Sequence, residues 1–263
     1  MLRDITIGQH YPADSIIHRL DPRTKLIGSF LMIVALFLIT PLIGYGVVLV
    51  VLSTVILLSK VPVKFILKGL KPILFFIVIA VSINMFLTPG RVVFSFWIFE
   101  ITAEGIDRAL MTFFRFTFLI VTSSLVTLTT SPMALTDGIE RLLTPLKKIK
   151  FPAHELAMMM TIALRFIPTL IEEADKIMKA QMARGADFES GNIFKRAKNM
   201  IPLLVPLFIS AFRRADELAM AMEARCYRGG EGRTRLNVLK FNSSDYMALC
   251  LSVIYLVLVI IYL

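Results

Sequence analysis

The sequence predicts an all-α, polytopic membrane protein that combines transmembrane helices with long amphipathic helices on the cytoplasmic side. Of its 263 residues 57% are apolar and 18% charged, and the mean hydropathy of +0.76 is too high for a soluble domain of this size. Charge-free runs alternate with one long charged stretch. We therefore expect residues 1–135 to hold four spans, residues 136–245 to form a cytoplasmic helical region, and residues 246–263 to form a last span.

The first two spans are predicted from a run without charge. Residues 26–59, a run of 34 positions, contain no charged side chain, which is too long for one crossing and enough for two short ones. Pro41, Gly44 and Gly46 interrupt the run near its middle, and such residues break helices. The sequence therefore predicts a helical hairpin with arms of about 17 residues.

Lysines after this hairpin orient the chain. They are spaced along a short amphipathic stretch: Lys60, Lys64, Lys68 and Lys71. Cytoplasmic loops are rich in Lys and Arg, so this loop and the N-terminus are placed inside. Residues 72–90, 116–135 and 246–263 then supply three more spans, which puts the 91–108 loop and the C-terminus outside.

Two polar or aromatic segments leave alternatives open. Residues 92–99 are β-branched and aromatic, which indicates either a short strand or an interfacial anchor around Trp97. The fourth span is rich in hydroxyls, which can bond to a neighbouring helix or back to their own helix. They belong to Thr117, Thr122, Ser123, Ser124, Thr127, Thr129 and Thr130.

Residues 136–245 are too many for a connecting loop. Their apolar blocks, 156–164 and 200–212, are shorter than a span and predict amphipathic helices at the cytoplasmic surface. We expect helix starts or bends at four prolines and helix ends at two glycine sites. These are Pro152, Pro168, Pro202 and Pro206, and Gly185 and Gly229–Gly230.

This region repeats itself at an offset of 41 residues, because residues 169–185 align with residues 210–226. Each copy predicts a helix that ends just after an arginine, Arg184 in the first and Arg225 in the second. One such arginine would only complement the helix dipole, whereas two equivalent ones suggest two equivalent receptors. A planar guanidinium can make bidentate bonds to a carboxylate, which suits protein docking.

The aligned copies also differ in charge. Glu172–Glu173 in the first copy matches Arg213–Arg214 in the second. The sequence therefore predicts that the two repeat helices contact one another through complementary charge, although both pairs could instead be solvated.

The motifs at the two helix ends are Ala183-Arg184-Gly185 and Ala224-Arg225-Cys226. With Asp21-Pro22-Arg23-Thr24-Lys25 before the first span, they resemble the transmembrane T component of energy-coupling factor transporters over the whole chain. This resemblance implies a multi-pass protein of the prokaryotic cytoplasmic membrane. In that family the coupling helices cross as an X, and their ends enter grooves on two ATP-binding-cassette ATPase subunits.

The resemblance also implies a substrate-binding membrane partner, the S component, which is exchangeable in some systems and often carries a vitamin. Ala183, Arg184, Gly185, Ala224, Arg225 and Cys226 are the implied ATPase-docking residues. Cys226 departs from the family pattern, where glycine is usual, so a different cap is expected at the second helix end.

Other classes fit less well. There is no Gly-x-x-x-x-Gly-Lys-Ser/Thr loop, so ATP hydrolysis is assigned to partner subunits. His10, His18 and His154 lack ligand spacing, and neither a catalytic site, a cofactor nor a metal is expected. Nucleic acid is not expected either, because the net charge of +10 follows from the positive-inside rule.

The runner-up is a stand-alone secondary transporter or channel, which ordinarily carries ionisable groups inside its spans. The five predicted spans have none, and Arg115 is interpreted as an interfacial arginine at the external edge of the fourth. Eight methionines gather in the cytoplasmic region, either as adaptable packing or as a surface for several partners. They are Met158, Met159, Met160, Met178, Met182, Met200, Met220 and Met222.

Overall fold

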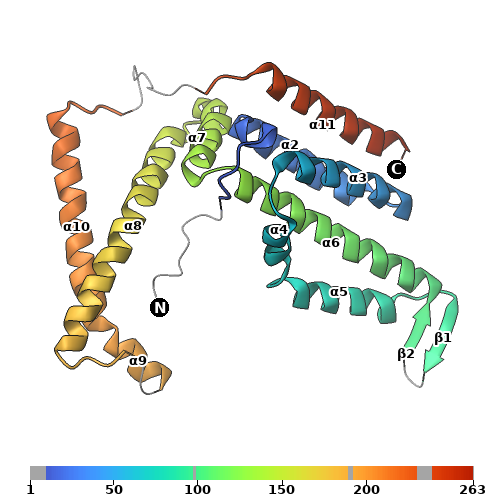
Figure 1. Cartoon of the computed structure of the whole chain (residues 1–263), viewed down its shortest axis with the longest axis horizontal. Helices are drawn as coiled ribbons and strands as arrows, with labels where there is room; N and C mark the ends of the chain where they lie inside the picture. The colour runs from blue at the N-terminus through green and yellow to red at the C-terminus, as the bar shows by residue number, and fades with distance from the viewer. Residues whose placement is uncertain (1–9, 97–98, 189–191, 230–238, 263) are drawn as a thin grey trace. The chain divides into compact units, whose positions relative to one another are not determined.

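The computed structural model describes residues 10–96, 99–188, 192–229 and 239–262 and is mostly helical (Figure 1). Its contacts divide the chain into two compact units. Among the described residues the membrane unit comprises 10–96, 99–142 and 239–262, and the motif unit comprises 143–188 and 192–229.

The membrane unit begins with the predicted hairpin. The short helix α1 (Ile16–Arg19) precedes α2 (Pro22–Leu38) and α3 (Leu42–Ser59), which are 17 and 18 residues long. Asp21 caps α2 by accepting a hydrogen bond from the Arg23 N–H, and Pro22 takes the first helical turn, where its missing N–H costs nothing. The hairpin and the length of its arms are confirmed.

The third predicted span is divided in the structure. The amphipathic helix α4 (Val63–Leu70) and the apolar helix α5 (Leu74–Leu87) meet at a bend of 62°. Ile66 on α4 is 2% exposed, whereas its lysines face outward. Gly69 lets α4 approach α6, because a Cβ there would lie 2.7 Å from the Ser124 hydroxyl.

The strand alternative is confirmed for residues 92–96. β1 (Val92–Phe96) pairs antiparallel with β2 (Phe99–Thr102), and Figure 1 shows this hairpin between α5 and α6. Trp97, the proposed interfacial anchor, lies outside the described residues.

The bounds predicted for the fourth span are wrong. The helix there, α6 (Ala103–Thr129), starts 13 residues earlier than residue 116 and ends six before residue 135. The Thr102 hydroxyl caps its start by accepting from the Gly105 N–H at 3.0 Å. Ser131 before Pro132 disfavours helical backbone at its end, which separates α6 from α7 (Pro132–Leu143).

Arg115 therefore lies in the middle of α6, half-buried, and not at the start of the helix. Its interfacial position stays a prediction. Its Nε donates to the Tyr45 hydroxyl at 3.0 Å and its Nη2 to the Ile39 carbonyl at 3.2 Å. A candidate span thus carries a charged side chain, which hydropathy missed because it averages one arginine with many apolar neighbours.

The hydroxyls of α6 bond mainly within the helix. Thr122 donates to the Phe118 carbonyl at 2.8 Å, Thr127 to Ser123 at 3.1 Å and Thr129 to Leu125 at 2.7 Å. For these three threonines the intrahelical alternative is confirmed.

The core of the membrane unit gathers apolar side chains of α2, α3 and α6, with Val259 added from α11 (Ser243–Tyr262). Asp245 joins α11 to the start of α2: its buried carboxylate, 1% exposed, accepts from the Asp21 N–H and the Asn242 N–H, each at 2.8 Å. The core residues include Ala35, Leu36, Val48, Leu52, Phe118, Val121, Leu125 and Val259.

Asp21 belongs to the same polar cluster and lies just before α2. Burial raises the pKa of its carboxyl, but hydrogen bonds from the Arg23 side chain and N–H outweigh that effect and hold the pKa below its usual value. The charged pair therefore stays ionised at neutral pH in a site where Asp21 is 6% exposed.

The motif unit holds the 3-10 helix η2 (Thr144–Ile149), α8 (Ala153–Ala183), α9 (Ile193–Asn199) and α10 (Ile201–Ala224). Pro152 precedes α8 and Pro202 lies in the first turn of α10, as predicted for helix starts. Pro168 and Pro206 lie inside the two long helices.

The apolar block 156–164 lies within a long helix, as predicted, because it belongs to the 31-residue α8. The best 18-residue stretch of α8 has a mean hydropathy of 1.3, which is enough to make it a candidate span. By length and composition the described chain has four candidate spans, α3, α6, α8 and α11, and a fifth if the bent pair α4 and α5 is one. The cytoplasmic location of α8 remains a prediction.

Candidate functional site

The first repeat helix ends at the predicted arginine. Arg184 is the C-cap of α8, and Gly185 follows it with a φ of +88°. The Gly185 N–H donates to the Met182 carbonyl at 2.9 Å and the Ala186 N–H to the Gln181 carbonyl at 3.0 Å. These two bonds form a Schellman motif, in which a left-handed residue terminates the helix.

The second helix ends in the same way. Arg225 is the C-cap of α10, the Cys226 N–H donates to the Glu223 carbonyl at 2.8 Å, and the Tyr227 N–H donates to Met222 at 3.0 Å. Cys226 has a φ of +54°, so it adopts the left-handed conformation that Gly185 has in the first copy. The expectation of a different cap at Cys226 is wrong, since the bonds that close the helix come from backbone groups.

All six motif residues are solvent-exposed. They are Ala183, Arg184, Gly185, Ala224, Arg225 and Cys226. Within the described residues, neither the Arg184 nor the Arg225 guanidinium makes a hydrogen bond or an ion pair. Each helix thus presents a cation with unused donors beside small neighbours, which leaves room for a partner to approach.

The two repeat helices contact one another at aligned positions. An Arg214 Nη2 lies 2.8 Å from a Glu173 carboxylate oxygen, and the Ser210 hydroxyl donates to the other oxygen of that carboxylate. Glu173 and Arg214 are 41 residues apart, which is the repeat offset. The predicted contact through complementary charge is confirmed for this pair.

This ion pair also relates the two arginines to each other. Arg184 follows Glu173 by 11 positions, and Arg225 follows Arg214 by 11 positions. At 1.5 Å per residue each arginine lies roughly 16 Å along its helix from the pair. In Figure 1 α8 descends and α10 ascends, so the two arginine ends lie at opposite ends of the helix pair.

Two further contacts hold the segments around the caps. The Tyr227 hydroxyl lies 3.3 Å from His154 Nε2, which ties the residue after the second cap to the first turn of α8. Asn199 Nδ2 donates to the Asp187 carbonyl at 2.6 Å, which ties the end of α9 to the segment after the first cap. The sequence predicted a helix start at Pro152, and His154 lies in that first turn. Its contact with Tyr227 gives it a structural role there.

Sequence reasoning missed Ser210, which joins the ion pair from the position aligned with Thr169. The sequence did hold a signal for Ser210, because both copies of the repeat carry a hydroxyl side chain at that position. The His154–Tyr227 contact had no local signal, since 73 positions separate the two residues.

Comparison with known proteins agrees with this architecture. Residues 13–236 match the family model CbiQ, described as "Cobalt transport protein". The chain is 56% identical over 260 residues to the energy-coupling factor transporter transmembrane protein EcfT of Ruminiclostridium cellulolyticum, covering 99% of this chain and 97% of that protein. It is 57% identical over 250 residues to the Clostridium kluyveri protein of the same name, covering 94% and 93%.

The similarity extends to Bacillus subtilis, whose energy-coupling factor transporter transmembrane protein EcfT is 49% identical over 246 residues, or 93% of each chain. These matches cover both units, including α8 and α10 with their arginine ends. The chain therefore belongs to the CbiQ family and, within it, to the EcfT transmembrane proteins of energy-coupling factor transporters.

Proposed function

We propose that Arg184 and Arg225 dock the two coupling helices, α8 and α10, into two ATP-binding-cassette ATPase subunits, and that these helices transmit movements of the ATPases to the membrane unit. The single observation that carries the proposal is the equivalence of the two ends. Both have an exposed, unpaired arginine at the C-cap of a long helix closed by the same Schellman motif. Two equivalent ends call for two equivalent receptors.

The chemistry of the ends supports docking in preference to a structural role. A guanidinium with free donors can form bidentate bonds to a carboxylate in a groove, and small alanines beside it allow close approach. The helix dipole accounts for a cation at the end of a helix, but it requires neither a planar guanidinium nor small exposed residues beside it.

The motif unit also offers a surface for the substrate-binding S component. None of its eight clustered methionines is buried, and Met220 is 61% exposed. On α10 large apolar side chains are exposed as well, among them Phe208 at 61% and Phe212 at 69%. Methionine adapts to differently shaped partners, so this surface suits S components that are exchanged on one module.

Substrate choice is assigned to the S component. The family description names cobalt transport, and the resemblance to the T component points to vitamins as well. Uptake assays should therefore compare cobalt with vitamins in cells that produce this chain together with a candidate S component.

The test of docking is co-purification of the ATPases and substrate uptake for Arg184→Ala, Arg225→Ala and the double variant. Charge-assisted bonds contribute about 1.5–3 kcal/mol each, so losing one arginine should weaken ATPase association roughly 10- to 150-fold. The double variant should lose transport. Lysine at either position should rescue only partly, because it keeps the charge without the fork.

Arg228→Ala is the matched control. Arg228 is exposed like Arg225 and three positions away from it, but it lies after the cap and has no counterpart in the first copy. Its variant should bind the ATPases nearly as well as the wild type. Full ATPase binding and normal uptake by the double variant would show that the arginines have no docking role.

A further inference from the structure

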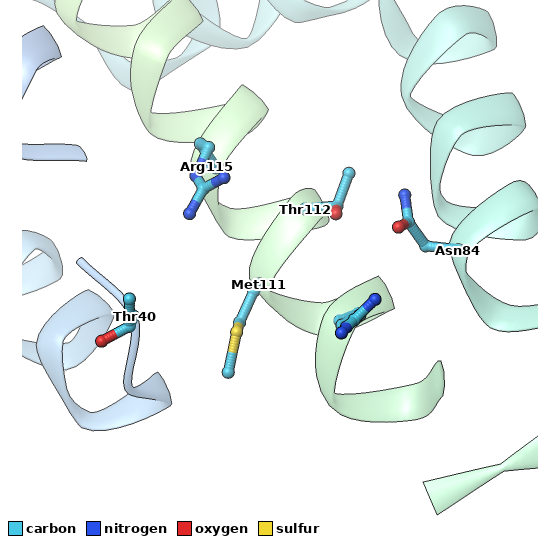
Figure 2. A pocket seen from close by; sticks show the side chains of 6 residues that line it. Thr40, Asn84, Met111, Thr112 and Arg115 are labelled. Atoms are coloured by element: carbon cyan, nitrogen blue, oxygen red, sulfur yellow. The ribbon is translucent and has the colours of Figure 1, made fainter. Parts of the chain in front are cut away.

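The membrane unit contains a polar cavity that ATPase docking does not use. It has a volume of about 270 Å³ and is formed by the N-terminal half of α6, by α5 and by the loop between α2 and α3. Figure 2 shows Met111, Thr112 and Arg115 on α6, with Asn84 on one side and Thr40 on the other. The lining residues are Thr40, Asn84, Arg108, Met111, Thr112 and Arg115.

Two arginines give the cavity its charge. Arg108 and Arg115 are seven positions apart on α6, about two helical turns, and therefore share one face of the helix. Arg115 donates to the Tyr45 hydroxyl and the Ile39 carbonyl, which are neutral acceptors. Arg108 is exposed, and among the described residues neither arginine has a carboxylate in salt-bridge range.

The arginines lie in a helix long and apolar enough to cross a bilayer. Where such a helix meets hydrocarbon, an arginine is costly unless an anion or water compensates its charge, and such residues mark functional sites. Two uncompensated guanidinium groups around one cavity therefore indicate an anionic ligand. Guanidinium groups bind phosphate through paired hydrogen bonds, and Asn84 and Thr112 add neutral polar groups.

The surroundings of the cavity are apolar. The Arg115 guanidinium lies 5.7 Å from the centroid of the Phe37 ring. The Phe37 side chain is itself 58% exposed. A ligand here would meet cations at its head and aromatic surface beside it, which is the chemistry of a phospholipid rather than of a free ion.

We propose that this cavity binds the phosphate of a glycerophospholipid headgroup, held by Arg108 and Arg115, with an acyl chain lying along the Phe37 ring. The bound lipid completes the charge balance of α6 at the α2–α3 loop, where Arg115 already bonds to the Ile39 carbonyl. This inference is independent of the proposed ATPase docking, which concerns residues of the motif unit.

The test uses the full-length chain in a neutral detergent, with lipid retention followed by native mass spectrometry. The probes are dioleoylphosphatidylglycerol, dioleoylglycerol, which has the same chains without a phosphate, and inorganic phosphate. The wild type should retain phosphatidylglycerol and not dioleoylglycerol. Arg108→Gln should weaken retention about tenfold, as expected for the loss of one charge-assisted bond.

Arg108 makes no hydrogen bond among the described residues, so its variant should fold normally, as thermal unfolding will check. Arg115→Lys keeps the charge but loses the fork and should also weaken retention. Arg91→Gln is the matched control, because Arg91 is an exposed arginine outside the cavity lining and should leave retention unchanged.

Four results would overturn the proposal. Retention of phosphatidylglycerol by Arg108→Gln and Arg115→Lys at the wild-type level would remove the arginines from lipid binding. Equal retention of dioleoylglycerol would show that the phosphate is not recognised, and equally tight binding of inorganic phosphate would assign the site to a free anion. If Arg108→Gln instead loses a co-purifying protein with lipid retention intact, the ligand is a partner's carboxylate.

Discussion

The residue that follows each motif arginine, Arg184 or Arg225, decides how its helix ends. Gly185 and Cys226 both have positive φ, +88° and +54°, and glycine alone adopts that conformation without strain. The same motif is therefore closed at no backbone cost in one copy and at some cost in the other. Cys226 is an exposed cysteine that forms no disulfide among the described residues.

At this scale we predict that Gly185→Ala lowers the stability of the helix end by about 1 kcal/mol, the cost of a left-handed alanine. Nothing lies within 4 Å of a Cβ at this position, so the cost is one of backbone conformation without a clash. Thermal unfolding of the purified protein and ATPase co-purification would measure it.

Cys226→Gly is the matched control for that prediction, because it should be neutral or stabilising at the equivalent place. A stabilising Gly185→Ala, or a destabilising Cys226→Gly, would mean that the left-handed caps do not limit these helix ends.

At the scale of elements, the contact of α8 with α10 rests on a partly exposed ion pair. The side chains of Arg214 and Glu173 are 39% and 23% exposed, and such pairs contribute at most about 1 kcal/mol. The ion pair fixes the register of α8 against α10 more than it stabilises their contact. It joins aligned positions of the repeat, so Arg184 and Arg225 lie at equal distances from it along their helices.

We therefore predict that Glu173→Arg or Arg214→Glu alone weakens assembly with the ATPases, because each places like charges between α8 and α10. The double reversal should restore part of the loss. A double-mutant cycle on ATPase co-purification measures the coupling, and a coupling of zero would show that the pair does not orient the helices.

At the scale of the whole molecule, the chain is a multi-pass membrane protein whose orientation is predicted from its lysines. Length and composition leave α8 among the candidate spans, although five charged residues gather in its C-terminal half. They are Glu172, Glu173, Asp175, Lys176 and Lys179. A docking role for Arg184 requires its end of α8 to be cytoplasmic.

Cysteine labelling tests this topology. In a variant without Cys226 and Cys250, single cysteines at Lys68, Lys150 and Ala186 should be protected from an impermeant reagent in intact cells, whereas those at Val92 and Tyr262 should react. Reaction at Lys68 would reverse the orientation. Labelling of only one of Lys150 and Ala186 would make α8 a membrane span.

The sequence by itself determined the features that depend on local chemistry. A bilayer cannot hydrogen-bond exposed backbone, so an apolar chain with long charge-free runs has to be helical. Pro41 divides the first hairpin, Gly185 ends α8, and the Ala-Arg repeat identifies the two helix ends and the family. Each of these signals lies within a few residues of the structure that it predicts.

Only the tertiary structure decided what depends on distant neighbours. Arg115 lies inside a helix because Thr102 caps α6 earlier than its charges suggested, and its partners, Tyr45 and Ile39, are 70 and 76 positions away. Asp245 meets the Asp21 N–H across 224 positions. Hydropathy and spacing describe one helix at a time, whereas a buried charge is stabilised by whichever groups the fold brings to it, and no local pattern records them.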